Sequence, residues 1–400
     1  MFSRVFKAFA YPDFRLLWAG ACVSSVGTWM QKVAQSWLIF EISQSPFLLG
    51  VDAFLGEIPI FLFSLIGGVV ADRMDRRRLL IVSQIIQLSC AFLLAALIGF
   101  GVVRIWHILT LSFVVGTAQA FGGPAYQALI PTLVRPHDLQ NAIALNSIQF
   151  NLARVVGPAL GGIVFTKFGY VWCFSLNGLS YVAVIITLLL LTTKFIPKAT
   201  GSMLDSMKEG IQFIRSHGSM EALIALAFLM TFLGIPLLTF LPVIAKEVFH
   251  QGPEVFTQLL STSGAGAVFG ALVVAWLGNV RNKGRVALSV LMFLGLGMTA
   301  FALSKSLLLS FALMFLTGAA LIAVFAMISS LVQLITGDEM RGRVMSVYNV
   351  AFRGGMPLGN LVSGYFVPIL TAPVVLAVNG VLLFALGLYF FTMQRKVRDL

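Results

Sequence analysis

The sequence predicts an all-α integral membrane protein with twelve transmembrane helices, arranged as two pseudo-symmetric halves of six helices each. Three observations lead to this fold class: the composition, the spacing of the apolar runs, and an internal repeat. Of the 400 residues, 59% are hydrophobic and 10% are charged. A soluble domain carries about 25% charged residues, so the composition excludes a water-soluble fold.

The apolar runs are long enough to cross a bilayer, which takes about 20 helical residues. Polar or basic segments separate the runs from one another. The twelve expected spans cover residues 15–41, 47–71, 79–100, 105–130, 140–166, 169–192, 219–246, 254–278, 286–304, 306–335, 344–369 and 372–393.

The distribution of lysine and arginine predicts the orientation in the membrane. Most of the 27 basic residues lie before the first span, after the last span, or in the loops that follow even-numbered spans. Basic loops stay in the cytoplasm, so we expect both termini to be cytoplasmic and the chain to lie in the plasma or inner membrane. The opposite loops hold only Arg104, Lys167, Lys246 and Lys305. The net charge of +12 is therefore a topology signal facing anionic lipid, and no nucleic-acid partner is expected.

A polar segment over residues 193–218 separates the two halves. Its apolar residues recur at helical spacing, which is typical of an amphipathic helix that lies along the membrane surface. These residues are Met203, Met207, Ile211 and Ile214. We therefore expect a first half over residues 1–192, a cytoplasmic linker over residues 193–218, and a second half over residues 219–400.

Like residues recur in both halves at nearly the same offset. The pairs are Asn177 and Asn379, Gly68 and Gly270, Asp138 and Asp338, Arg154 and Arg353, and Pro158 and Pro357. Such repetition predicts two parallel six-helix repeats, with a substrate site between them near the middle of the membrane. The symmetry is lost at Asp72, which corresponds to Val274.

The loop after the second span is the most distinctive polar segment of the chain. It reads Gly68-x-x-x-Asp72-Arg73-x-x-Arg76-Arg77. This pattern resembles the signature between the second and third helices of the major facilitator superfamily.

The resemblance implies that these five residues form a conformational latch. Asp72 is expected to contact the start of the eleventh helix, near Arg341 or Arg343, only when the cytoplasmic side is closed. Asp75 departs from the pattern, because the family usually has glycine at that position. The geometry of the turn is therefore left open.

The fifth span carries glycines around a proline: Gly157, Pro158, Gly161 and Gly162. Glycines let helices pack closely, and proline removes one backbone hydrogen bond. The run is either a bendable gate or ordinary small-residue packing. It resembles the signature of the drug-and-proton antiporter branch of the superfamily.

Further segments of the first half resemble the transmembrane secretion effector family, the enterobactin-exporter type. The matching residues are 14–18, 25–31, 123–125 and 146–162. The resemblance implies efflux of small amphipathic molecules driven by the proton gradient. The fourth span has no arginine over residues 111–125, where drug antiporters usually carry one, so proton coupling is a separate question from transport.

Ionisable residues within the expected spans are costly there and usually face a cavity. These residues are Lys32, Asp52, Glu57, Arg154 and Arg353. Burial in an apolar span favours the neutral form of a carboxyl group, so we expect Glu57, with Asp52 as second candidate, to exchange the driving proton. The substrate cavity is expected to be lined by Lys32, Gln35, Arg154 and Arg353.

Other interpretations of these residues stay open. Asp52 could lie at the outer membrane interface, and the two arginines could bond to backbone carbonyls at bent helices. The carboxylates could also form fixed ion pairs with Lys32 and Arg154, which would make the protein an uncoupled facilitator.

These features predict a monomeric secondary active exporter of small drug-like or siderophore-like molecules, with protons as the coupling ion and the lipid bilayer as its surroundings. A lipid or lysophospholipid translocase and an uncoupled facilitator are the alternatives on the same fold. We expect no enzymatic activity, cofactor or metal, because no catalytic or metal-ligating group clusters at one depth and no phosphate-binding loop is present. The polar hinge and the glycine–proline run disfavour a static receptor or scaffold.

Overall fold

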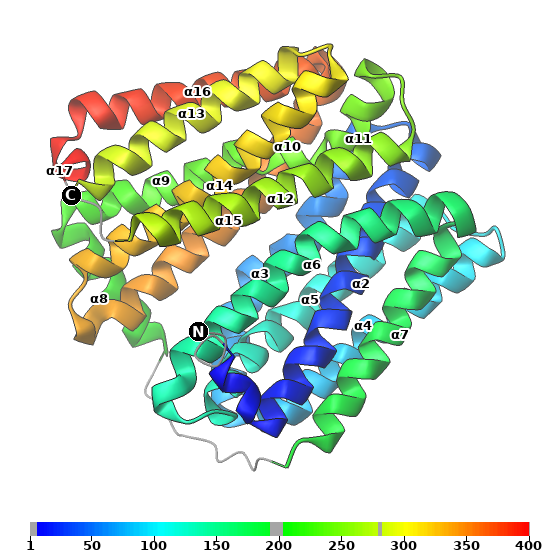
Figure 1. Ribbon diagram of the computed structural model, residues 1–400, viewed down its shortest axis with the longest axis horizontal. Helices are drawn as coiled ribbons and strands as arrows, with labels where there is room; N and C mark the ends of the chain where they lie inside the picture. The colour runs from blue at the N-terminus through cyan, green and yellow to red at the C-terminus, as the bar shows by residue number, and fades with distance from the viewer. Residues whose placement is uncertain (1–5, 193–202, 279–281, 400) are drawn as a thin grey trace. The chain divides into compact units, whose positions relative to one another are not determined.

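The structure is a computed structural model that describes residues 6–192, 203–278 and 282–399. Within these ranges all regular secondary structure is helical (Figure 1). The all-α architecture is therefore confirmed, and the expected spans coincide with helices whose ends differ from the prediction by a few residues, except over residues 219–246.

The helices before the polar linker are long and nearly contiguous. A 3-10 turn, η1(Lys7–Ala10), precedes them, and η2(Ile130–Thr132) and η3(Pro136–Asp138) connect α5 to α6. The long helices are α2(Pro12–Ser43), α3(Pro46–Arg73), α4(Arg76–Gly99), α5(Ile105–Leu129), α6(Leu139–Phe168) and α7(Tyr170–Leu190).

The described part of the linker forms one helix, α8(Met203–Ser216), and residues 193–202 lie outside the described residues. Ile214 on α8 is buried and Ile211 is 37% exposed. A helix is therefore present where the sequence predicts one, and its location along the membrane surface stays a prediction.

The helices after the linker follow the predicted spans with one correction. They are α9(Gly218–Gly234), α12(Pro253–Leu277), α13(Lys283–Leu303), α14(Leu307–Ile335), α15(Asp338–Leu370), α16(Ala372–Met393) and the short α17(Arg395–Arg398). The span predicted over residues 219–246 corresponds to one apolar segment of membrane-spanning length, Gly218–Val248, but it is not one regular helix, because α9 ends at Gly234.

Short helical pieces continue the chain beyond α9. They are α10(Pro236–Thr239), α11(Leu241–Val243) and the π-helical turn η4(Ile244–Val248). Pro236 and Pro242 lack the backbone N–H that would continue the hydrogen-bond ladder. Two prolines six positions apart therefore divide one apolar run into several pieces.

The chain clusters into two compact units. One unit contains Met1–Ser43 and Leu55–Thr200, and the other contains Gln44–Phe54 and Gly201–Leu400. The first two turns of α3 thus cluster with the second unit, although the rest of α3 belongs to the first.

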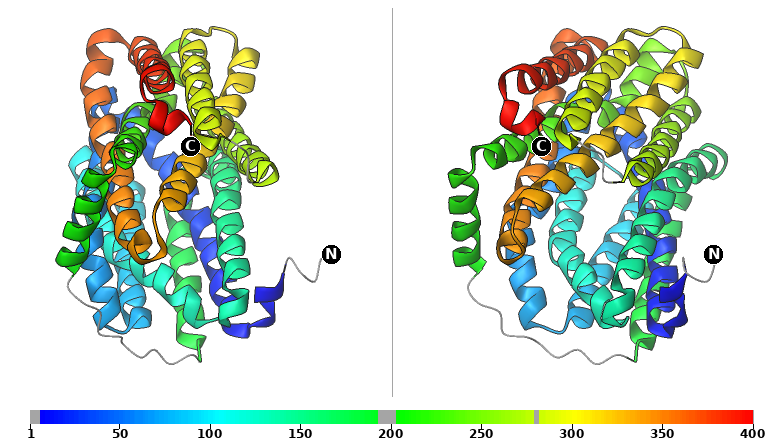
Figure 2. Two further views of the ribbon diagram at one scale, coloured as in Figure 1. Left: turned by 90° about the vertical axis from the view of Figure 1, so that its left-hand side faces the viewer. Right: turned by 60° about the vertical axis from the view of Figure 1, so that its left-hand side comes forward.

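The same pattern of helix pairing occurs in both units (Figures 1 and 2). In the first unit α4 packs against α5 and α7, and α2 packs against α6. In the second unit α13 packs against α14 and α16, and α9 packs against α15. The repetition found in the sequence thus extends to the packing of helices within each unit.

Two glycines 202 positions apart make equivalent close contacts. A Cβ at Gly116 on α5 would collide with the backbone carbonyl of Gly56 on α3. A Cβ at Gly318 on α14 would collide with the backbone carbonyl of Ser263 on α12. Small residues let backbones approach this closely, which is how membrane helices associate.

Large apolar side chains are exposed along the helices. Phe100, Trp276 and Leu308 are each more than 80% exposed, at 81%, 84% and 82%. By length and composition, 10 helical segments of the described residues are apolar enough to cross a membrane. The remaining two expected spans, α2 and α15, are 32 and 33 residues long and carry more polar residues.

Candidate functional site

The polar hinge joins α3 to α4, and Asp75 begins the second of these helices. Its carboxylate accepts hydrogen bonds from the backbone N–H groups of Arg77 (2.9 Å) and Arg78 (3.4 Å). The φ of Asp75 is −63°, so the turn requires no left-handed conformation and hence no glycine. Aspartate is among the best N-cap residues, and this explains how the chain accommodates it where glycine was expected.

The arginines of the hinge form hydrogen bonds to the ends of other helices in the first unit. Arg76 donates from Nη1 to the carbonyl of Ala128 on α5 (2.8 Å) and pairs with Asp72 (3.3 Å). Arg77 donates to the carbonyls of Leu191 (2.9 Å) and Leu189 (2.5 Å) at the end of α7. The last carbonyls of a helix have no intrahelical partner and carry partial negative charge, so both arginines stabilise helix C-termini.

The remaining predicted latch residues lie on the last turns of α3. Gly68 is half-buried and Arg73 is exposed. The neighbouring Gly67 lies against the backbone of Ala120 on α5, where a Cβ would collide. The sequence pattern predicted a role for Gly68 and not for Gly67, which makes the closer contact.

The corresponding loop of the second unit makes different contacts. Val274 replaces the aspartate, and Arg285 at the start of α13 pairs with Asp399 beyond α17 (2.9 Å). Hydrogen bonds from Arg398 and Arg285 lower the pKa of Asp399 to about 2. The carboxylate therefore stays ionised and links α13 to the end of the described chain.

The glycine–proline run lies on α6, where it packs against α2. Gly157 lies against Val26 and Trp29, and Gly161 lies against Met30. Gly157, Pro158, Gly161 and Gly162 are all buried, and α6 is one helix through Pro158. The close packing accounts for the glycines on this face, and bending of α6 stays a prediction.

A cluster of charged residues surrounds Trp29 in the first unit. The Nζ of Lys32 on α2 lies 3.7 Å from Oε1 of Glu57 on α3. Lys32 also lies 5.6 Å from the centre of the Trp29 ring, and the guanidinium of Arg154 on α6 lies 6.0 Å from it. Cations within about 6 Å of an indole face are attracted to it. Two of the predicted site residues, Lys32 and Arg154, thus lie at one indole, and a third, Glu57, pairs with Lys32.

The ion pair beside Trp29 is not fully buried. The side chain of Lys32 is 59% exposed and that of Glu57 is 26% exposed. The sequence pattern did not indicate a role for Trp29, although its position three residues before Lys32 places both on one face of α2.

Gln35 lies one turn beyond Lys32 and is already bonded within the unit. Its Nε2 donates to Oγ of Ser112 on α5 (2.9 Å). Asn177 on α7 donates to the neighbouring Gln31 in a similar contact (2.6 Å). These amides connect α2 to its neighbours, and the predicted contact between Gln35 and substrate stays untested.

Asp52 and Arg353 belong to the second unit. Asp52 is half-buried on the part of α3 that clusters there, and Arg353 is exposed on α15. On α15, Gly355 and Gly359 lie against Phe228 and Phe232 of α9, as the glycines of α6 lie against α2. Arg353 thus precedes a glycine-packed face on α15 by two residues, whereas Arg154 precedes the glycine-packed face of α6 by three.

Comparison with known proteins identifies the family. The sequence matches the model of the transmembrane secretion effector family over residues 3–399. The chain belongs to this family. The major facilitator superfamily, predicted from the hinge pattern, is thereby confirmed.

The chain is similar to several transporters. It is 22% identical to macrolide efflux protein A of Streptococcus pyogenes, over 88% of this chain and 89% of the relative. It is 25% identical to the enterobactin exporter EntS of Citrobacter koseri, over 97% of this chain and 93% of the relative. Among solved structures, a D-xylose–proton symporter superposes with a TM-score of 0.77 at 12% identity, over 98% of this chain and 100% of the other. The family and the apolar helices together make the chain a multi-pass membrane transport protein.

Proposed function

We propose that this secretion effector protein is a secondary active exporter, which moves small amphipathic molecules out of the cytoplasm by alternating access in exchange for protons. The relatives named for macrolide efflux and enterobactin export support the direction of transport. The observation that carries the proposal is the accessible pair of Lys32 and Glu57 beside Trp29.

Glu57 is the proposed proton site. While Glu57 is ionised, its charge holds the ammonium group of Lys32 at 3.7 Å. Protonation removes that attraction and leaves Lys32 and Arg154 as the charged groups around Trp29. An aromatic or anionic part of a substrate would then find two cations and an indole, so protons and substrate bind at the same place in alternation.

The hinge is the proposed latch of the alternating-access cycle. In this structure Asp72 pairs with Arg76 of its own unit. In the other state Asp72 would exchange this contact for the start of α15, near Arg341 or Arg343. A charge-assisted hydrogen bond contributes about 1.5–3 kcal/mol, which is enough to shift a two-state equilibrium about tenfold or more.

Transport into proteoliposomes tests the proton site. Glu57→Gln should abolish accumulation driven by a pH gradient and still permit downhill exchange of substrate. Glu254→Gln is the matched control, because Glu254 lies in the first turn of α12 and outside the Trp29 cluster. The control variant should accumulate substrate as the unmodified protein does.

The uncoupled facilitator is the second candidate, and the existing ion pair favours it. If Lys32 and Glu57 only neutralise one another, the pair never releases a proton. In that case the unmodified protein would equilibrate substrate and would not accumulate it under a pH gradient. A separate outcome is that gradient-driven accumulation persists in both Glu57→Gln and Asp52→Asn. That result would show that the residues of α3 do not take part in proton coupling.

A further inference from the structure

The linker helix α8 packs against the start of α15, and both helices belong to the second unit. Gly210 of α8 is buried, and a Cβ there would lie 2.8 Å from the backbone carbonyl oxygen of Arg343 on α15. Ile214, one turn further along α8, is also buried. A glycine at the contact lets two helix backbones approach closely, so α8 lies directly on the first two turns of α15.

The side chain of Arg343 is bonded to the same helix. Its Nη1 forms an ion pair with Oε2 of Glu209 on α8. Nη1 also donates to Sδ of Met340, one turn earlier on α15 (3.4 Å). The linker helix therefore contacts Arg343 twice, because Gly210 meets its carbonyl and Glu209 binds its guanidinium.

The proposed latch needs the same guanidinium for another contact. Arg343, with Arg341, is the expected partner of Asp72 in the other state of the transport cycle. In this structure Asp72 pairs with Arg76 at 3.3 Å, and Arg343 pairs with Glu209. A carboxylate bound to Arg343 offsets its positive charge and repels a second carboxylate. The Glu209 pair therefore weakens the attraction between Asp72 and the start of α15.

We propose that Glu209 of the linker helix competes with Asp72 for Arg343, and that Glu209 thereby controls how readily the latch closes. While Glu209 holds Arg343, the latch stays open. Release of Glu209 makes the guanidinium available to Asp72. The inference rests on the proposed function, because the latch belongs to the alternating-access cycle, and it makes Glu209 a positioning residue for that latch.

The exposure of the pair determines the size of the effect. The side chain of Arg343 is 41% exposed and that of Glu209 is 50% exposed. Ion pairs at exposed positions contribute little free energy. We therefore expect loss of the pair to change the ratio of closed to open latch by about twofold to fivefold. Glu209 would thus adjust the equilibrium between the two states without locking either of them.

The experiment measures this ratio in the purified full-length protein by double electron–electron resonance. Spin labels are placed at the end of α3 and at the start of α15. Glu209→Gln should raise the ratio of closed to open latch, because a neutral amide holds Arg343 less strongly than a carboxylate does. Glu221→Gln is the matched control, since it neutralises another exposed carboxylate of the same unit, in the first turn of α9. Equal ratios in Glu209→Gln and in the unmodified protein would overturn the inference.

A double variant separates competition from a merely structural role of Glu209. In Asp72→Asn the competing charge is absent, so adding Glu209→Gln should change the ratio by less than it does in the unmodified protein. If Glu209 only holds α8 in place, the substitution should change the ratio equally in both backgrounds. Equal changes would therefore reject competition with Asp72.

Gly210 provides a second variant that leaves Glu209 intact. The Cβ of Gly210→Ala would push α8 away from the carbonyl of Arg343. The Glu209 pair should weaken as a result, and the ratio should rise as it does in Glu209→Gln. This variant serves if Glu209→Gln does not yield monodisperse protein, and an unchanged ratio would then overturn the inference.

Transport in proteoliposomes keeps this inference separate from the proposed function. A ratio that depends on Glu209 and on Asp72, in a protein that transports no substrate, would contradict the exporter and support the competition. Gradient-driven export by a protein whose ratio does not respond to Glu209→Gln would support the exporter and overturn the competition.

Discussion

The carboxylate of Asp75 accepts the backbone N–H of Arg77 at 2.9 Å and thereby caps α4. Replacing a capping aspartate by alanine costs about 0.5–2 kcal/mol, and replacing it by glycine costs only a few tenths. We therefore expect Asp75→Ala to lower the apparent melting temperature of the purified protein. Asp75→Gly, which restores the residue usual in the superfamily, should change it little. Equal melting temperatures for Asp75→Ala and the unmodified protein would show that the cap contributes no stability.

The contact of α6 with α2 predicts the effect of a single methyl group. A Cβ at Gly157 would collide with the side chain of Trp29 and the carbonyl of Val26. Gly157→Ala should destabilise the protein by about 1–3 kcal/mol, as overpacked sites do. Gly123→Ala on α5 is the control, because a Cβ there meets open space. Thermal unfolding, monitored by size-exclusion chromatography, compares the stabilities of the Gly157→Ala and Gly123→Ala variants. Equal stabilities would contradict the packing described.

The latch predicts that Asp72→Asn lowers turnover and increases accessibility of the cytoplasmic side without lowering expression. The reason is that the neutral amide forms a weaker contact in the closed state than the carboxylate does. Double electron–electron resonance between spin labels at the end of α3 and the start of α15 measures the change. Val274→Asn, at the corresponding place in the second half, should show little effect. Distances that do not change in Asp72→Asn would exclude the latch.

The orientation predicts which loops can be labelled from outside the cell. Single cysteines placed over residues 73–78 should resist a membrane-impermeant maleimide, because basic loops remain cytoplasmic. Cysteines near Lys246 or Lys305 should react. The background protein needs Cys22, Cys90 and Cys173 replaced, of which Cys90 and Cys173 are buried. The opposite labelling pattern would invert the topology and with it the direction assigned to transport.

The sequence was sufficient to predict most of the helices, because their spans are predominantly apolar runs of membrane length separated by polar segments. It did not predict the break after Gly234, since a proline within an apolar run is compatible with a kinked helix as well as with separate pieces. It predicted functional roles for Lys32, Glu57 and Arg154, because a charged residue within a membrane span is energetically costly.

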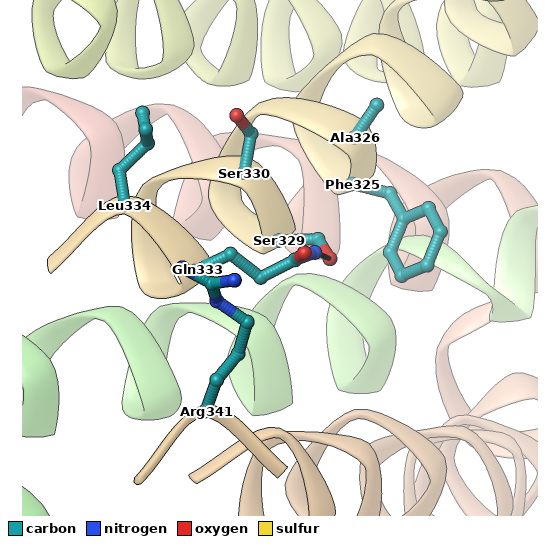
Figure 3. A pocket seen from close by; sticks show the side chains of 7 residues that line it. All are labelled: Phe325, Ala326, Ser329, Ser330, Gln333, Leu334 and Arg341. Atoms are coloured by element: carbon teal, nitrogen blue, oxygen red, sulfur yellow. Dashed lines mark hydrogen bonds between the residues drawn. The ribbon is translucent and has the colours of Figure 1, made fainter. Parts of the chain in front are cut away.

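The sequence could not show that these residues meet around Trp29. That contact depends on how α2, α3 and α6 are rotated against each other, and helical periodicity fixes only the face of each helix by itself. The surface hollow at the end of α14 could not be predicted for a similar reason (Figure 3). Ser329, Ser330 and Gln333 are uncharged and common in membrane helices, and the sequence does not show that Arg341 of α15 lies across from them.

The close backbone contacts at Gly116 and Gly318 predict that neither position tolerates substitution. At each position, every side chain larger than hydrogen places its Cβ against a backbone carbonyl of the adjacent helix, and a carbonyl within a helix has little freedom to move. In a saturation library selected for function, both positions should accept glycine alone. Asp72 and Val274, which are also 202 positions apart, show that other equivalent sites have diverged. The common origin of the two halves would thus stay visible where helix backbones are in contact. It would be lost at positions whose side chains act in the change between conformational states.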